Sequence, residues 1–200
     1  DRVSEMLAIP VERPAFDTIV ASGPNSALPH AQPGTRVFTE GDIVLLDFGG
    51  VLDGYCVDLS RVATIGTPSK VARRLHSAVA AAQEAAIAMV RPGVWASEVD
   101  GAARRVLEES GLGEAFTHGT GHGLGLEIHE DPRISKRDSD RKRAMAEGSD
   151  VLLVPGMVFT VEPGAYEPGQ GGVRIEDDVL VTDEGYELLT DVRRDLWVQS

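Results

Sequence analysis

The chain has 200 residues, 42% hydrophobic and 26% charged, which is enough to bury one substantial core. Its formal net charge of −13 argues against nucleic acid as the main partner, because phosphate binding needs a basic surface. No run of about 18 apolar residues occurs, so no membrane span is predicted. The first residues lack a signal-peptide pattern, and the single cysteine, Cys56, cannot form an internal disulfide; both observations favour a cytoplasmic location.

The first half of the chain is predicted to begin with strands. Apolar, β-branched stretches place them at residues 16–22, 42–50 and 54–66. The dipeptide Asp53-Gly54 is a strong turn signal, so the last two strands are predicted to pair as a hairpin.

Two helices follow, and then strands return. Residues 69–90 are rich in alanine and begin at a plausible Ser69 cap, and a second helix is predicted from about residue 97 to residue 110. Further strands are predicted at residues 157–164, 171–182 and 186–189. The polar stretch 133–150 is interpreted as a long exposed loop. Strands, helices and strands in this order indicate an α+β protein.

Four acidic residues interrupt strands that are otherwise apolar: Asp47, Asp58, Glu162 and Glu176. Burying one unpaired carboxylate is so unfavourable that the group must become protonated or find a partner. Pairing across the predicted hairpin could bring Asp47 and Asp58 close together. We therefore expect the four carboxylates to gather around cations.

The segment HGTGHGLGLEIHE, residues 118–130, supplies a candidate imidazole for such cations. His122 lies between Gly121 and Gly123, so its backbone could approach a metal closely. Oxygen-rich ligation with one imidazole suits a hard or borderline divalent ion, and four carboxylates can balance the charge of two such ions. Taken singly, a strand aspartate or a lone histidine is more often structural, so the constellation carries the prediction.

Four motifs now support a family resemblance. They are DFGGVLDGYCVDLSR (47–61), HGTGHGLGLEIHEDP (118–132), PGMVFTVEPGAY (155–166) and GGVRIEDD (171–178). In this order they resemble the pita-bread metallopeptidases, specifically the Xaa-Pro aminopeptidases and the Xaa-Pro dipeptidases (prolidases). The resemblance implies the creatinase/aminopeptidase-like pita-bread fold, a curved and mostly antiparallel sheet with covering helices. It also implies that residues 1–200 are one catalytic domain, lacking the usual N-terminal portion.

The resemblance implies a site for two metal ions. Asp47 would bind one ion, Asp58 and Glu176 would be shared, and His122 with Glu162 would complete the other. The nucleophile would be a water or hydroxide between the ions, with its pKa lowered by their charge. Manganese is the usual metal in such proteins, with cobalt or zinc as alternatives.

The resemblance also implies roles around the metals. His30 and His129 would contact the substrate carbonyl and the tetrahedral intermediate, and Glu162 would handle the proton of the water. Arg174 would neutralise the carboxylate cluster. His118 would orient the site or contact substrate, and the alternative is a hydrogen bond that holds the glycine-rich segment.

The predicted reaction is metal-dependent hydrolysis of the Xaa-Pro bond, at the N-terminus of peptides or in dipeptides. The partner is then a peptide with proline at its second position, and a homodimer is one assembly that the resemblance allows. The motifs leave open whether the enzyme is a dipeptidase or an aminopeptidase. Alternatives are a methionine aminopeptidase-like enzyme, the metal-free creatinase reaction, and a non-catalytic module that binds peptides or proteins. Retention of all five ligands argues against the creatinase and non-catalytic alternatives, and the motif GGVRIEDD favours the proline-specific branch over the methionine branch.

Overall fold

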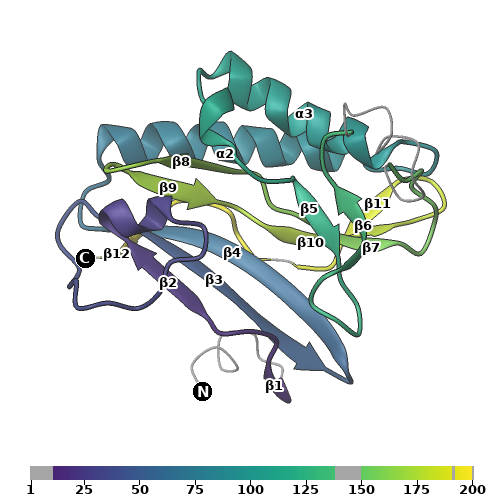
Figure 1. Ribbon diagram of the computed structural model, residues 1–200, viewed down its shortest axis with the longest axis horizontal. Coiled ribbons are helices and arrows are strands. Elements are labelled where there is room, and N and C mark those ends of the chain that lie inside the picture. The colour runs from purple at the N-terminus through teal and green to yellow at the C-terminus, as the bar shows by residue number, and fades with distance from the viewer. Residues whose placement is uncertain (1–10, 138–149, 191, 200) are drawn as a thin grey trace.

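The structure is a computed structural model that describes residues 11–137, 150–190 and 192–199. Within these residues, two long helices lie side by side along one side of the strands (Figure 1). They are α2, Lys70–Met89, and α3, Ala96–Glu109. Two short 3-10 turns, η1 at Gly23–Ala27 and η2 at Gly113–Ala115, complete the helical elements described. None of the described helices is long and apolar enough to cross a membrane.

The strands form three sheets. The first has the order β1-β3-β4-β12, with β2 also paired to β3; its strands are β1 Arg13–Pro14, β2 Ile19–Ser22, β3 Ile43–Leu52, β4 Tyr55–Ile65 and β12 Trp197–Gln199. The second has the order β11-β10-β7-β5-β6, formed by β5 Gly121–Gly123, β6 Glu130–Ile134, β7 Val158–Val161, β10 Asp177–Val181 and β11 Tyr186–Leu188. The third pairs β8 Gly164–Glu167 with β9 Gly171–Arg174. Among the described strands only β4 and β12 pair in parallel, so the expected mostly antiparallel arrangement is confirmed.

The predicted hairpin is confirmed at its turn. Leu52 pairs with Tyr55, which leaves Asp53 and Gly54 as a two-residue connection. Both have positive φ, 49° and 82°, as a type I′ turn requires. Glycine adopts such a φ without cost and aspartate tolerates it better than most residues, so this dipeptide fixes the register of β3 against β4.

The core lies between the helices and the strands. Ser69 caps α2, because its hydroxyl accepts a hydrogen bond from the backbone N–H of Ala72 at 3.0 Å. The buried face of α2 includes Leu75 and Val79, and side chains such as Phe159 of β7 belong to the same cluster. Small alanines on α2 let α3 pack closely beside it. Both predicted helices are therefore confirmed, with α3 starting one residue before the predicted position.

The C-terminal strands differ from the prediction. The stretch 171–182 is two strands in two sheets, β9 and β10, because the chain leaves β9 after Arg174. There the backbone N–H of Glu176 donates to the carbonyl of Ser60 in β4, at 3.2 Å. The predicted strand 157–164 likewise divides into β7 and β8 at Glu162-Pro163.

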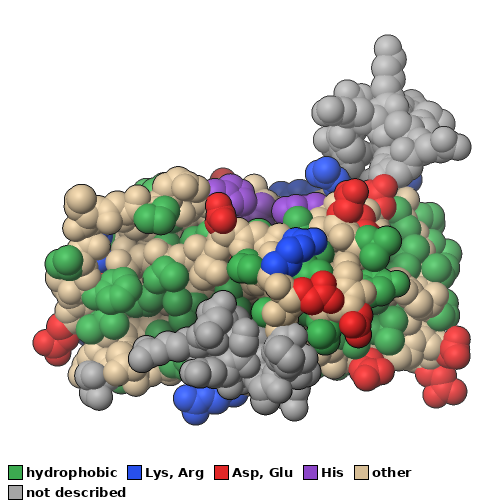
Figure 2. All heavy atoms as spheres, turned by 90° about the horizontal axis from the view of Figure 1, so that it is seen from below, with side chains coloured by type: hydrophobic (Ala, Val, Ile, Leu, Met, Phe, Trp, Pro, Cys, Tyr) green, Lys and Arg blue, Asp and Glu red, His purple; other side chains and the backbone are tan. Residues whose placement is uncertain are grey.

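The predicted loop 133–150 is also revised at its start. Arg133 and Ile134 belong to β6, and residues 138–149 lie outside the described part of the chain. On the face shown in Figure 2, apolar side chains are spread over much of the surface, and histidines gather along one rim beside charged side chains.

Candidate functional site

The β3–β4 hairpin carries two of the carboxylates on one face. Asp47 is opposite Ser60, and Asp58, two residues before Ser60, is opposite Gly49. Because side chains alternate along a strand, Asp47, Ser60 and Asp58 all project to the same side. The two carboxylates are diagonal neighbours, 9% and 5% exposed. The expectation that the hairpin brings them together is confirmed.

The other two carboxylates lie where strands break. Glu162 falls between β7 and β8, and its backbone N–H donates to the carbonyl of Thr120 at 2.7 Å. Glu176 falls between β9 and β10, and its carboxylate accepts a hydrogen bond from the Ser60 hydroxyl at 2.7 Å. The break at Glu176 therefore brings that residue against the hairpin, and the break at Glu162 holds that residue beside the segment that leads into β5.

The glycine-rich segment places His122 beside these acids. A Cβ on Gly121 would lie 1.8 Å from the Thr160 carbonyl oxygen, and one on Gly123 would lie 2.3 Å from that of Asp131. Only glycine fits at either position, so β5 can run close to its neighbours. His122 Nε2 then lies 3.5 Å from a carboxylate oxygen of Glu162 and 3.8 Å from one of Asp58.

The state of His122 suits a ligand. Its Nδ1 lies 3.0 Å from the carbonyl oxygen of Gly123, so Nδ1 carries the proton and donates, and Nε2 keeps its lone pair. Burial lowers the pKa of His122 and favours the neutral ring. Ligand atoms of Asp58, His122 and Glu176 all lie within 4.8 Å of one another.

The carboxylates lack a full set of hydrogen-bond partners among the described residues. Among the described residues, one buried oxygen each of Asp47, Asp58 and Glu176 has no hydrogen bond. Burial, followed by the charge of Asp47, raises the pKa of Asp58 to about 8. Burial also raises the pKa of Glu162 to about 7, and that of Glu176 well above its usual value. These unpartnered oxygens and the free Nε2 of His122 fit a site for divalent cations.

Arg174 is the guanidinium within this cluster, and it is 4% exposed. It donates to Asp47, to the Ser60 hydroxyl at 3.0 Å and to the Tyr166 hydroxyl at 2.9 Å. One guanidinium cannot neutralise four carboxylates, so the predicted neutralisation by Arg174 can be only partial and the cluster needs further positive charge. As predicted, Arg174 and Glu176 face the same side, and they meet at Ser60.

All nine predicted site residues line one cavity of about 950 Å³; they are His30, Asp47, Asp58, His118, His122, His129, Glu162, Arg174 and Glu176. His30 and His129 are exposed, and the ring of His129 lies 4.3 Å from that of His122 between centroids. Both can therefore meet a molecule that enters the cavity.

His118 is held more firmly than the other cavity histidines. Its Nδ1 lies 2.7 Å from the Gly119 carbonyl oxygen and its Nε2 lies 2.9 Å from the Tyr166 hydroxyl. Burial lowers the pKa of His118 to about 4, so the ring is neutral. Both nitrogens are engaged within the protein, which fits the orienting role and the predicted hydrogen bond within the glycine-rich segment.

Several residues that build this site were not predicted from the sequence. Tyr166 links Arg174 to His118, and Ser60 links Arg174 to Glu176. Tyrosine and serine are common in strands, so their presence there gave no signal of a site. A better signal existed for Asp100, an aspartate on the apolar side of a predicted helix.

Asp100 anchors the glycine-rich segment to α3. It is fully buried and accepts hydrogen bonds from the backbone N–H of Thr120, at 3.1 Å, and from its hydroxyl, at 2.9 Å. One turn further along α3, Arg104 pairs with Asp100 and donates to the carbonyl of His118. The helix therefore fixes the segment on both sides of Gly119.

Comparison with known proteins places this geometry in a family. The model of Metallopeptidase family M24 matches residues 3–183. The Xaa-Pro dipeptidase of Pyrococcus furiosus is 44% identical over 185 residues, 92% of this chain and 50% of that protein. A dipeptidase from Pyrococcus horikoshii, 44% identical, superposes with a TM-score of 0.85 over 93% of this chain and 49% of its own. An X-Pro aminopeptidase from Thermotoga maritima, 43% identical, superposes with a TM-score of 0.87 over 97% of this chain and 51% of its own.

The chain thus spans about half the length of the relatives that it matches. Likeness of this degree to solved Xaa-Pro peptidases confirms the predicted pita-bread fold and the predicted family. The chain belongs to Metallopeptidase family M24.

Proposed function

We propose that residues 1–200 form the catalytic domain of an enzyme that hydrolyses the bond between a first residue and a proline. The names of the relatives support this reaction, since they include Xaa-Pro dipeptidases and an X-Pro aminopeptidase. The observation that carries the proposal is the set of three buried carboxylate oxygens that have no hydrogen-bond partner among the described residues, beside a neutral imidazole whose Nε2 keeps its lone pair. The methionine-specific, creatinase-like and non-catalytic alternatives have no comparable support.

The proposed centre holds two divalent ions. Asp47 would bind one, Asp58 and Glu176 would be shared, and His122 and Glu162 would complete the other. When bound, the ions supply Lewis acidity and lower the pKa of water. We propose manganese because the donor set is rich in carboxylate oxygen, with cobalt or zinc as alternatives.

The remaining groups would act on substrate and protons. Glu162 would take up and return the proton of the water. Exposed His30 and His129 would donate hydrogen bonds to the substrate carbonyl and stabilise charge on the tetrahedral oxygen. Arg174 would hold Asp47 in place, and His118 would hold Tyr166.

The preferred substrate is proposed to be a dipeptide. Arg133 lines the cavity from β6, across from His122, and no hydrogen bond or ion pair engages its guanidinium within the described part of the chain. A free guanidinium suits the carboxylate at the end of an Xaa-Pro dipeptide, a contact that a longer peptide could not make in the same way.

Two further proposals concern the cell and the assembly. A cytoplasmic location is supported by the single cysteine, which fits a reducing compartment. Assembly as a homodimer rests on the family resemblance alone. Size-exclusion chromatography with light scattering would test the assembly.

The reaction is tested with metal-loaded full-length protein on Ala-Pro, Ala-Pro-Ala, Met-Ala-Ser and creatine. We expect hydrolysis of the proline substrates, loss of activity after chelation and recovery on adding Mn²⁺, with about two ions per chain by elemental analysis. Cleavage of the methionyl peptide alone, or full activity without metal, would overturn the proposal.

The dipeptide preference is tested with Arg133→Gln. Loss of a charge-assisted contact should raise KM for Ala-Pro by roughly 10- to 100-fold and change that for Ala-Pro-Ala much less. Arg105→Gln is the matched control, because Arg105 is exposed on α3 and does not line the cavity. Equal effects on the two substrates would remove the argument for a dipeptidase.

A further inference from the structure

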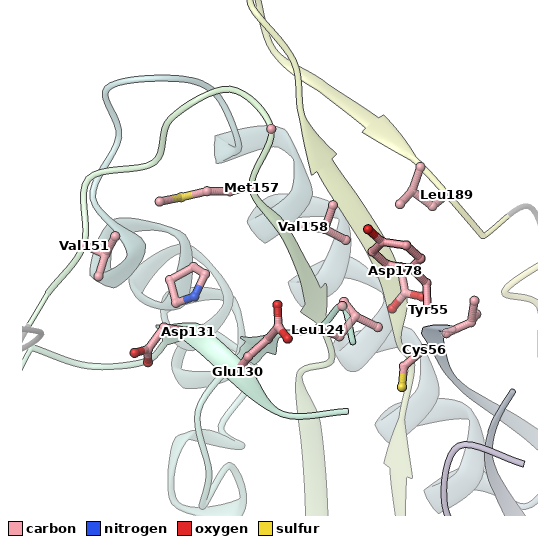
Figure 3. A pocket seen from close by; sticks show the side chains of 14 residues that line it. Tyr55, Cys56, Leu124, Glu130, Asp131, Val151, Met157, Val158, Asp178 and Leu189 are labelled. Atoms are coloured by element: carbon pink, nitrogen blue, oxygen red, sulfur yellow. The ribbon is translucent and has the colours of Figure 1, made fainter. Parts of the chain in front are cut away.

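A second cavity, of about 620 Å³, adjoins the catalytic one (Figure 3). Its wall comes from the start of β4, from the segment that joins β5 to β6, and from residues near β7, β10 and β11. Glu130 and Asp131 line both cavities, so the segment that carries His129 separates them. A cavity of this size can hold a small organic molecule.

The lining combines apolar side chains with negative charge. The apolar members include Tyr55, Val151, Met157, Val158 and Leu189. The charged members are Glu130, Asp131 and Asp178, and no lysine, arginine or histidine is among the lining residues. In Figure 3, Met157 and Val151 lie on one side of the space, and Tyr55, Val158 and Leu189 on the other. Such a lining favours a cation with an apolar body.

Asp178 gives this cavity a specific anchor. Its side chain is 2% exposed, and one carboxylate oxygen accepts the backbone N–H of Asp58 at 3.1 Å. The other oxygen, Oδ1, has no hydrogen-bond partner among the described residues. A buried polar atom without a partner is costly, and the ones that persist in folded proteins call for an explanation. An ammonium group in the cavity would supply the missing donor.

We propose that this cavity binds a small apolar monoamine, a molecule with one ammonium group on an aliphatic or aromatic body and no carboxylate. The three acidic side chains disfavour a ligand that carries its own carboxylate. The site is therefore distinct from one for an amino acid or dipeptide, the substrate and product classes of the proposed peptidase. The ammonium would pair with Asp178, and the apolar body would contact Val158 and Leu189.

Calorimetry on the metal-loaded full-length protein tests this inference with three probes of one shape: 3-methylbutylamine, 3-methylbutan-1-ol and leucine. Metal loading keeps the catalytic carboxylates occupied, so amine binding there does not interfere. We expect saturable binding of the amine and binding at least about tenfold weaker for the alcohol, which lacks the charge. Leucine should not compete with the amine, because the acidic lining disfavours its carboxylate. No saturable amine binding, or equal binding of the alcohol, overturns the proposal.

Variants locate the site. Leu189→Lys places a competing ammonium at the mouth and should weaken amine binding at least about tenfold. Val198→Lys adds the same charge at an exposed position of β12 outside the lining and should leave binding unchanged. If Leu189→Lys does not fold, Asp178→Asn removes the anchoring charge at nearly constant size and should weaken binding similarly. Equal affinities in all these proteins would overturn the proposal, and none of the readouts depends on peptidase activity.

Discussion

The β3–β4 hairpin and the interrupted strands β7–β10 each bring two carboxylates to the same cavity, by different structural means. In the hairpin, Asp47 and Asp58 lie within regular strands, and the alternation of side chains fixes their direction. In the second region, Glu162 and Glu176 lie at breaks, and hydrogen bonds to residues distant in sequence, Thr120 and Ser60, fix their backbones. The local strand pattern therefore positions Asp47 and Asp58, whereas tertiary contacts position Glu162 and Glu176. Ser60 joins them, because it belongs to β4 and binds Glu176 through its hydroxyl and its carbonyl.

The largest expected effect is loss of one shared carboxylate from either region. Asp58→Ala and Glu176→Ala should each lower kcat/KM for Ala-Pro by roughly a thousandfold, because metal-ion catalysis contributes several kcal/mol. The metal-free variants should unfold at an equal or higher temperature than the metal-free parent, since each loses a buried carboxylate without a full set of partners. His76→Ala, on α2 outside the cavity, is the control for activity. An active Glu176→Ala enzyme would show that Glu176 is wrongly assigned as a metal ligand.

The next effect concerns the close approach of β5 to its neighbours. Gly121→Ala would place a Cβ against the Thr160 carbonyl, so β5 must shift and carry His122 with it. We expect a loss of about 1–3 kcal/mol of unfolding free energy and weaker metal binding, measured by denaturation and by metal titration. Gly101→Ala is the matched control, because Gly101 lies in α3 with open space around it. That change should add up to about 1 kcal/mol of stability. Wild-type metal affinity in Gly121→Ala would contradict the tight packing described.

The pH dependence of stability can be compared between the two regions, because each contains a buried carboxyl group with a raised pKa. In the metal-free protein the pKa values of Asp58 and Glu162 are raised from 3.8 and 4.5 to about 8 and about 7. The folded state then holds protons that the unfolded chain has released, so the stabilising contribution is complete below about pH 4 and is lost as pH rises through 7 to 8. Denaturation midpoints with chelator should therefore fall from about pH 5 to about pH 8, and metal should reverse the fall.

Single variants show how much of the fall in the denaturation midpoint comes from Asp58 in the hairpin and how much from Glu162 at the strand break. Asp58→Asn should flatten it more than Glu162→Gln, because the pKa of Asp58 is raised further. A midpoint that rises over the same pH range in the metal-free parent would mean that the carboxylates are ionised and paired in the folded state.

The smallest effect tests whether the Tyr166 hydroxyl helps to position the side chains around the proposed metal centre. Tyr166→Phe removes the hydroxyl that joins Arg174 to His118. We expect kcat/KM to fall by about tenfold, as for other residues that orient metal ligands, and stability by about 1–2 kcal/mol. Tyr55→Phe changes an exposed tyrosine of the hairpin and should alter neither quantity. Equal activity of both variants would show that the Tyr166 hydroxyl does not position the centre.

The same comparison explains what could be predicted from the sequence. The turn dipeptide and strand alternation are local signals, so the hairpin with Asp47 and Asp58 followed from them, as did the helix that begins after Ser69. The breaks at Glu162 and Glu176 were missed because the backbone at each is held by a hydrogen bond to a residue distant in sequence. Tyr166 and Asp100 were missed for the same reason, since their partners come from other elements. The second cavity joins segments from across the chain, and no local pattern marks it.

The turn at Asp53-Gly54 has a consequence for how this protein can change over generations. One residue inserted there would turn Asp58 to the opposite face of the sheet, and two would restore the face but displace the carboxylate by about 7 Å. The length of the turn therefore cannot change while the metal centre is under selection. Among descendants of such a chain, a changed turn length would mark those lineages in which that selection had been released.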